Sequence, residues 1–324
     1  MDKNTIIGFV LIALVLIGFS WWNQPSAEQI EAQRKEDSVA AVMKENAEKK
    51  QKAEAEARKA QAEAAAKGDS TATFFSALNG SNQEIVLKNE KVELTFDTKG
   101  GTISKAVIKG FEDRDNKMDV TLFDGKTQKM NFMLAGKSEN IITQDLFFVP
   151  SNISDSTVTM TALAANGGSI VLNYELGKDY MLHFSLAANQ LSGMFAPNYK
   201  EVDIEWRDLA RQQEKGFTFE NRYSTLTYKE KNGGTDYLSE TSQKIDEKIE
   251  DQLDWVAFKN QFFSAALISK DNFAANSLMT SIPQEKGSGY LKQFNAKMKT
   301  AFDPTGAQPT EFEMYIGPND FRLI

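Results

Sequence analysis

The sequence predicts a mainly β protein, in which an antiparallel, sandwich-like domain follows one transmembrane helix and a long charged helical stalk. Three observations support this prediction. An uncharged apolar run extends from Ile6 to Trp22, a stretch rich in Ala, Glu and Lys follows from Ser26, and apolar and polar residues alternate from Glu84 onward. Period-two alternation is typical of strands, whereas long runs of strong helix formers favour helices. We therefore divide the chain into residues 1–25, 26–72 and 73–324.

Composition excludes several classes of function. The 324 residues contain no cysteine, which excludes disulfides, thiol chemistry and thiolate metal sites. The net charge is −8, and residues 68–324 carry the whole excess, with 35 acidic and 27 basic residues. Nucleic-acid binding needs clustered Lys and Arg that displace counterions from phosphates. We therefore expect no nucleic-acid partner.

The run from Ile6 to Trp22 contains no charged residue, and its 17 residues make about 25 Å of helix, which is the short end of a membrane span. A cleaved signal peptide is the alternative, but it requires small residues where Trp21 and Trp22 stand. Paired tryptophans suit the membrane–water interface. We expect an uncleaved anchor in the lipid bilayer, with the N-terminus inside and the rest of the chain outside the cytoplasm.

Residues 26–72 predict a charged helical stalk. Ser26 with Gln29 forms a capping box, and Gly68 is placed to end the helix. Acidic residues precede basic ones by four positions at several places, for example Glu31 and Lys35, a spacing that stabilises isolated helices. The stalk is either a coiled coil or docking arm, or a solvated spacer. Large apolar residues are too sparse for a heptad seam, which favours the spacer.

The β domain is predicted from alternating segments separated by Gly, Asn and Asp turns. Gly100 and Gly101 lie between two such segments and are expected to adopt positive φ, and Gly233–Gly234 is a similar candidate. Pro318 is expected to end the last strand, because proline lacks an N–H. The predicted strands are Glu84–Lys88, Lys91–Asp97, Thr157–Leu163, Ser169–Leu176, Tyr180–Ala187 and Glu201–Trp206.

No pattern of residues indicates catalysis, a cofactor or a metal site, so we do not expect an enzyme. The single histidine, His183, lies on a strand with Leu182 and Phe184 facing the other way. It is either a general acid near a carboxylate such as Glu175 or Glu205, or an exposed or groove-facing strand histidine without a partner. The second interpretation is favoured, because no spacing of carboxylates singles out a catalytic pair.

The segment from Ile245 to Ile268 is the most distinctive candidate for a contact surface. Trp255, Phe258, Phe262 and Phe263 recur at helical spacing, which suggests an element that docks on a membrane or a partner. The alternative is a core segment packed against a sheet, and the run Phe263 to Ile268 also fits a buried strand. The core interpretation is favoured for this segment.

Five segments, in order, resemble the YidC insertase family. The stretch from Asn89 to Phe111 resembles the start of its periplasmic domain, with a Thr-x-Gly-Gly turn between two strands. The other four resemble its first transmembrane helix, a mid-domain strand pair, a late amphipathic segment and the Tyr-x-Gly-Pro exit. They read MDKNTIIGFVLIALVLIGFSWW from Met1, YELGKDYMLHFSL from Tyr174, DWVAFKNQFFSAALI from Asp254 and MYIGPNDFRLI from Met314.

The resemblance implies a protein of the inner (plasma) membrane that assists insertion and folding of membrane proteins, alone or with the Sec translocon. It also implies a periplasmic β-supersandwich and five later membrane helices that form the insertion groove. We expect those helices to be absent here, because only six residues follow Pro318. This portion is then an anchoring and partner-docking part. The alternatives are an anchored periplasmic sugar-binding or mutarotase-like protein, or a stalked envelope scaffold.

Overall fold

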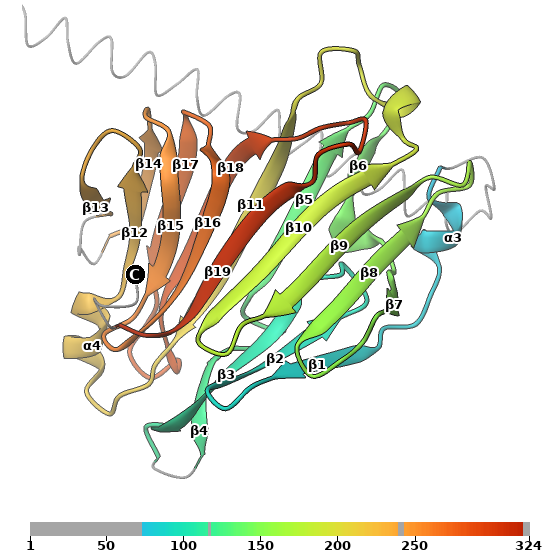
Figure 1. Cartoon of the computed structure of the whole chain (residues 1–324). Coiled ribbons are helices and arrows are strands. Elements are labelled where there is room, and N and C mark those ends of the chain that lie inside the picture. Colours follow the sequence, from blue (N-terminus) through green and yellow to red (C-terminus); the bar gives the residue numbers. More distant parts are fainter. Residues whose placement is uncertain (1–72, 116–117, 239–242, 320–324) are drawn as a thin grey trace, which may run out of the picture. The chain divides into compact units, whose positions relative to one another are not determined.

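The computed structural model describes residues 73–115, 118–238 and 243–319 (Figure 1). The predicted anchor from Ile6 to Trp22, its interface residues Trp21 and Trp22, and the predicted stalk lie outside these residues. Within the described ranges, no helix combines the length and the apolar character needed to cross a membrane.

The described part of the chain is dominated by antiparallel strands, as the sequence predicts. Its helical elements are short: α3 (Phe75–Leu78), η1 (Thr143–Asp145), η2 (Ser192–Met194) and α4 (Phe217–Tyr223). The strands are β1 (Glu84–Lys88), β2 (Val92–Asp97), β3 (Ile103–Glu112), β4 (Asp119–Phe123), β5 (Lys129–Ala135), β6 (Asn140–Ile142), β7 (Val149–Ser151), β8 (Thr157–Leu163), β9 (Ser169–Leu176), β10 (Met181–Asn189), β11 (Glu201–Arg211), β12 (Thr225–Glu230), β13 (Thr235–Tyr237), β14 (Ile245–Ile249), β15 (Leu253–Lys259), β16 (Phe263–Phe273), β17 (Ser277–Pro283), β18 (Tyr290–Ala301) and β19 (Thr310–Pro318).

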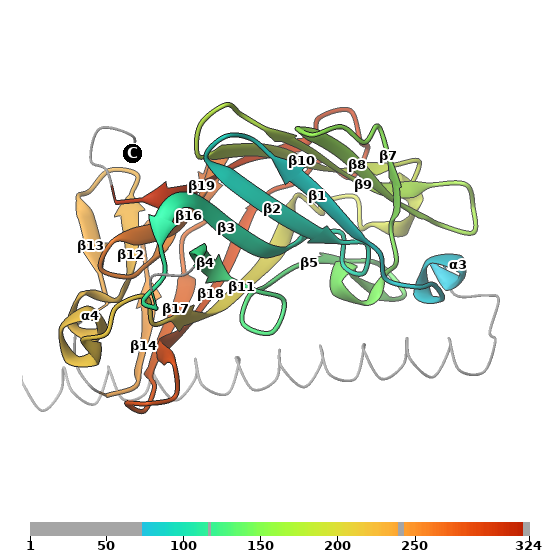
Figure 2. The same ribbon diagram turned by 90° about the horizontal axis from the view of Figure 1, so that it is seen from below.

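Three sheets form the domain. A nine-stranded sheet has the order β13-β12-β15-β16-β19-β10-β9-β8-β7, a six-stranded sheet the order β14-β17-β18-β11-β5-β6, and a smaller sheet the order β1-β2-β3-β4. Figure 2 shows β1, β2 and β3 on the same side of the nine-stranded sheet as β5 and β11. The nine-stranded sheet therefore has one covered face and one outer face.

Aromatic side chains connect the three sheets. Trp206 of the six-stranded sheet stacks on Phe258 of the nine-stranded sheet, with ring centroids 3.9 Å apart. Phe96 of the four-stranded sheet packs against Tyr174 of the nine-stranded sheet, with ring centroids 4.6 Å apart. The hydroxyl of Tyr174 is satisfied although buried, because it donates to the carbonyl oxygen of Gly101 at 2.8 Å. One continuous core thus lies between the sheets.

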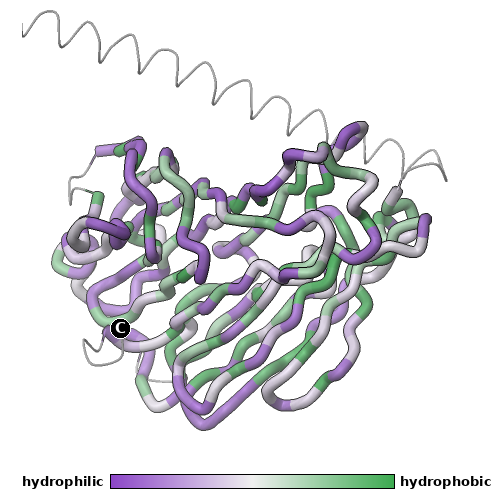
Figure 3. The backbone as a smooth tube through the Cα atoms, turned by 45° about the horizontal axis from the view of Figure 1, so that its top comes forward, coloured by the Kyte–Doolittle hydropathy of each residue, from purple (hydrophilic) through white to green (hydrophobic). Residues whose placement is uncertain are grey.

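Local alternation explains why these residues form strands. Along β9 and β10, buried residues alternate with half-buried or exposed ones, as the hydropathy of the backbone tube in Figure 3 illustrates. The predicted strands Glu84–Lys88, Thr157–Leu163 and Ser169–Leu176 match β1, β8 and β9 residue for residue. The prediction Glu201–Trp206 is too short, since β11 continues to Arg211.

The two glycine pairs behave differently. Gly100 and Gly101 have φ of +87° and +67° between β2 and β3, which confirms the expected turn. Gly233 and Gly234 lie between β12 and β13, but neither has a positive φ, so this part of the prediction is wrong. A Cβ atom at Gly233 would meet the Glu230 side chain, which would have to shift.

The segment from Ile245 to Ile268 forms no helix, so the helical spacing of its aromatic residues is misleading. Most of it lies in three strands, β14, β15 and the first half of β16. Asn260 turns the chain between β15 and β16, because its Oδ1 accepts hydrogen bonds from the backbone N–H groups of Phe262 (3.0 Å) and Phe263 (2.7 Å). The alternative of a buried strand from Phe263 is correct.

Candidate functional site

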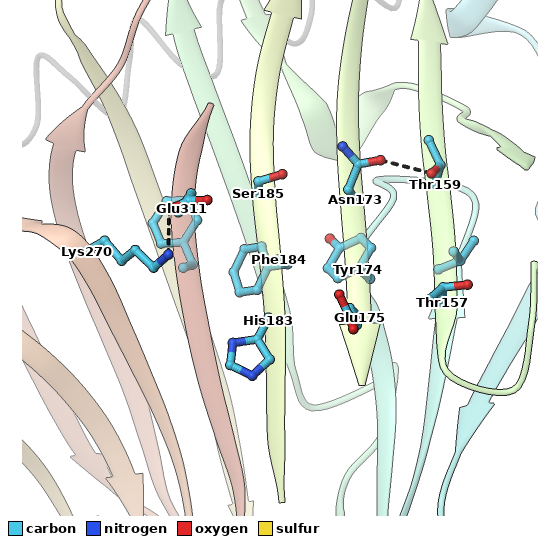
Figure 4. Close-up of a pocket in the computed structure, with 12 residues that line it drawn as sticks. Thr157, Thr159, Asn173, Tyr174, Glu175, His183, Phe184, Ser185, Lys270 and Glu311 are labelled. Atoms are coloured by element: carbon cyan, nitrogen blue, oxygen red, sulfur yellow. Dashed lines mark hydrogen bonds and ion pairs between the residues drawn. The ribbon is translucent and has the colours of Figure 1, made fainter. Parts of the chain in front are cut away.

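The outer face of the nine-stranded sheet carries rows of polar side chains (Figure 4). These rows arise from the antiparallel register of β8, β9, β10 and β19, which aligns alternate residues across the sheet. One row contains Thr157, Glu175, His183 and Glu313, and the next contains Thr159, Asn173, Ser185 and Glu311. The sheet thus presents a broad polar surface.

His183 has a carboxylate partner on this surface. Its Nδ1 lies 3.2 Å from Oε1 of Glu313, and the two side chains are 51% and 32% exposed. The expectation of a histidine without a partner is therefore wrong. The partner was missed because β19 lies far along the chain from β10, and only their pairing brings the two residues together.

The two carboxylates named from the sequence are placed differently. Glu175 is the register partner of His183 on β9. Glu205 belongs to β11 of the six-stranded sheet, where it accepts a hydrogen bond from Asn295 Nδ2 at 3.4 Å and lies 3.8 Å from Lys297 Nζ. Of these two carboxylates, the structure places only Glu175 beside His183.

Residues of these two rows line a shallow, open depression of about 340 Å³. At one side, Lys270 donates a hydrogen bond of 2.6 Å to Glu311, which raises the pKa of Lys270. At the other side, Thr159 donates to Asn173 at 2.9 Å. The depression offers exposed hydrogen-bonding groups suited to polar recognition. In the described ranges, no three His, Cys, Asp or Glu residues are grouped to hold a metal ion.

A small apolar patch lies beside the polar rows on the same outer face. Ala257, Ala266 and Tyr315 are buried there, covered in part by Tyr180 and Trp255. The register β15–β16–β19 places the first three in one row across the sheet. Trp255 packs against this patch and remains only half-buried.

The other three aromatic residues predicted as a contact surface do not share a face with Trp255. Phe258 and Phe263 are 4% and 5% exposed and belong to the core between the sheets. Phe262 lies in the turn between β15 and β16 and is 45% exposed. Of the four residues, only Trp255 and Phe262 reach the surface.

Sequence reasoning missed a second group of exposed side chains, which lie at the same end of the domain as Phe262. These are Phe111 and Met118 in the β3–β4 hairpin and Phe219 and Tyr223 on α4, which are between 39% and 69% exposed. Phe219 and Tyr223 are four residues apart, and their rings lie 5.0 Å apart. The i, i+4 spacing of Phe219 and Tyr223 was the only sign of this group in the sequence. It is a weak sign, because the helix that carries it has only seven residues.

Two acidic residues are buried among those described, Asp208 and Glu220. Asp208 on β11 is 6% exposed, and burial raises its pKa to about 7. Its Oδ1 has no hydrogen-bond partner among the described residues. It lines a small cavity of about 10 Å³ together with Phe258 and Ala265.

Comparison with known proteins identifies a family. The model of the YidC periplasmic domain matches residues 84–324. The protein named Membrane protein insertase YidC from Phocaeicola vulgatus is 47% identical over 100% of this chain and 52% of its own length. The protein of the same name from Bacteroides fragilis strain ATCC 25285 is 41% identical, again over 100% of this chain and 52% of its own length. The chain thus spans about half the length of the curated relatives it matches.

Two solved structures show distant likenesses. The periplasmic domain of Thermotoga maritima YidC is 12% identical, with a TM-score of 0.34, over 74% of this chain and 86% of that chain. A galactose mutarotase-like protein from Lactobacillus casei is also 12% identical, with a TM-score of 0.48, over 72% of this chain and 100% of that chain. Both TM-scores are too low to bear on function.

Proposed function

Because the chain belongs to the YidC family, whose periplasmic-domain model it matches over residues 84–324, we propose that it is the extracytoplasmic part of a membrane-protein insertase. The family match carries this proposal. It is supported by relatives named Membrane protein insertase YidC that align with the entire chain. The insertion step itself is assigned to the part of such proteins that lies beyond this chain.

The proposal includes an anchor and a location. Ile6 to Trp22 spans the inner membrane as one helix, with Trp21 and Trp22 at the outer interface and the N-terminus in the cytoplasm. Residues 26–72 form a charged helical spacer, and the β domain lies in the periplasm. Hydropathy, helix propensity and the family match support this arrangement.

The β domain acts by docking partners and not by catalysis. The open polar face around His183 supports this role, because its charged pairs are exposed to solvent and not enclosed in a cleft. Candidate partners are components of the Sec translocon and nascent membrane proteins, by resemblance to the family. Trp255 and Phe262 are the two predicted contact residues whose side chains are available to them.

Location can be tested with single cysteines, because the chain contains none of its own. Ala165, an exposed residue in the β8–β9 turn, is replaced by cysteine and treated with a membrane-impermeant maleimide on intact spheroplasts. We expect labelling without cell lysis at this site, and labelling of a cysteine at Asn4 only after lysis. Labelling of Asn4→Cys before lysis would contradict the proposed orientation.

Function can be tested with a chimera. This chain replaces the aligned half of the Phocaeicola vulgatus protein, with which it is 47% identical. We expect the chimera to support membrane-protein insertion when the host insertase is depleted. A chimera that reaches the membrane in normal amounts and inserts no protein would argue against the proposal. A matched chimera lacking residues 84–319 measures what the β domain contributes.

A further inference from the structure

Half of the exposed large apolar side chains among the described residues lie at one end of the domain. We define the exit-end rim as Phe111, Met118, Phe219, Tyr223 and Phe262. These are five of the ten exposed large apolar residues among those described, and they include all three exposed phenylalanines. Surface apolar residues are normally scattered, so their concentration at one end suggests a contact surface.

Contacts between three separate segments hold this end together. Phe111 of the β3–β4 hairpin packs edge-on against Phe263, with ring centroids 5.3 Å apart, directly beside Phe262. Gln213, which precedes α4, donates a hydrogen bond of 2.8 Å to the carbonyl oxygen of Thr121 in β4. Figures 1 and 2 both place α4 and the β15–β16 turn at the same end of the nine-stranded sheet.

Helix α4 is fixed so that its aromatic residues point outward. Glu220 is buried, and its carboxylate accepts hydrogen bonds from the backbone N–H groups of Gln213 (2.8 Å) and Glu214 (2.9 Å). Ser224, four residues later, is also buried, whereas Phe219 and Tyr223 are 56% and 41% exposed. The helix therefore shows a polar, anchored face to the domain and an aromatic face to the solvent.

The described chain also leaves the domain at this end. The side-chain amide of Asn319 donates to the carbonyl oxygens of Asn260 and Gln261, at 3.1 Å each, and its backbone N–H donates to that of Phe262 at 2.7 Å. The end of β19 is thus tied to the turn that carries Phe262. If the proposed function holds, the chain continues from here toward the membrane.

We propose that the exit-end rim docks on the outer surface of the lipid bilayer, with its aromatic rings in the headgroup layer. This inference rests on the proposed function. Acidic and basic side chains are interspersed around the rim, for example Glu112 and Arg114 or Glu214 and Lys215, so no strong field of one sign draws the domain to anionic lipid. Aromatic insertion into the interface drives the contact, and zwitterionic lipid is sufficient.

The test uses the full chain in phosphatidylcholine vesicles whose lipids carry a nitroxide near the headgroup. A fluorophore is attached to Thr218→Cys, an exposed position on α4, or to Ala165→Cys in the β8–β9 turn at the other edge of the sheet. We expect strong quenching at position 218 and little at position 165. Added anionic lipid or higher salt should leave the quenching unchanged.

A matched pair of variants tests the side chains. Replacing Phe219 and Phe262 together by serine should reduce quenching at position 218 to the level of position 165. Replacing Val149 and Leu163 by serine removes two comparably exposed apolar residues near the opposite edge, and should leave the quenching unchanged. Equal quenching at both positions, or none at position 218, would overturn the inference. Maleimide labelling at position 165 in spheroplasts reports separately on the proposed location.

Discussion

The indole of Trp206 stacks on the ring of Phe258, with centroids 3.9 Å apart and planes inclined by 19°. Trp206 is completely buried and Phe258 is 4% exposed, and Phe294 on β18 also stacks on Phe258, with ring centroids 5.4 Å apart. The contact joins the middle of the six-stranded sheet to the nine-stranded sheet. It shows why Phe258 cannot serve as a surface contact without opening the core.

Replacing Trp206 by alanine should therefore lower the free energy of unfolding by about 3–5 kcal/mol, because it leaves a large cavity between two sheets. The measurement is urea unfolding of the full chain in detergent. Tyr237→Ala, which removes a half-exposed aromatic residue from an edge strand, is the control and should cost less than about 1 kcal/mol. Similar losses for both variants would mean that the stack does not hold the sheets together.

The buried carboxyl group of Asp208 makes stability depend on pH. Its pKa is about 7 in the folded chain because burial disfavours the charged form, whereas the ordinary value is 3.8. The folded state therefore binds this proton more tightly than the unfolded state. The corresponding stability is present below about pH 4 and is lost as the pH rises toward about 7, by on the order of 4 kcal/mol at most.

The variant Asp208→Asn is neutral at every pH and tests this directly. The difference in free energy of unfolding, variant minus unmodified chain, should be more favourable to the variant at about pH 8 than at about pH 5. Glu220 and Glu247 also have raised pKa values, but they are present in both proteins, so the difference isolates Asp208. Parallel pH profiles for the two proteins would show that Asp208 does not titrate in this range.

The exposed pair of His183 and Glu313 should contribute little to stability, because solvent screens the interaction. His183→Ala should change the free energy of unfolding by less than about 1 kcal/mol. In the chimera with the Phocaeicola vulgatus protein, the same variant should insert membrane proteins normally. Loss of insertion by a folded His183→Ala chimera would assign His183 a role that the docking proposal does not include.

Gly101 and Gly110 both have positive φ, so alanine substitutions at the two positions distinguish the cost of backbone strain from the cost of steric crowding. A Cβ atom at Gly101 would lie 2.9 Å from the Phe148 ring, whereas one at Gly110 would meet no atom within 4 Å. Gly110→Ala should cost about 1–2 kcal/mol through strain alone. Gly101→Ala should cost more, as measured by thermal unfolding, because the Phe148 ring must also move. Equal costs would mean that the neighbouring ring moves freely.

Much of the β domain was predictable because alternation is a local signal. β1, β8 and β9 were predicted to the residue, since each has one face in the core and one toward solvent. The helical interpretation failed for Ile245 to Ile268, where Trp255 and Phe258 lie on opposite faces of one strand and Phe262 and Phe263 follow a turn, whereas the favoured core interpretation is correct for Phe258 and Phe263. Residues three and four apart in a hairpin imitate a helix when a turn shifts the alternation.

The candidate sites were less predictable, because each depends on contacts between distant segments. His183 gains Glu313 through the pairing of β10 with β19, and Phe111 meets Phe263 through the packing of the β3–β4 hairpin against β16. Asp208 occupies an inward position of an alternating strand, and only the opposing sheet makes it buried. None of these neighbours is close in sequence.

The sequence by itself determined the acidic β domain, the Gly100–Gly101 turn and, by ordered resemblance, the family, because composition, alternation and short motifs depend on neighbouring residues. Only the tertiary structure decided which aromatic residues are buried, which carboxylate meets His183 and where the exposed apolar residues gather. These properties depend on the register between strands and on the stacking of sheets, and both arise from contacts across the whole domain.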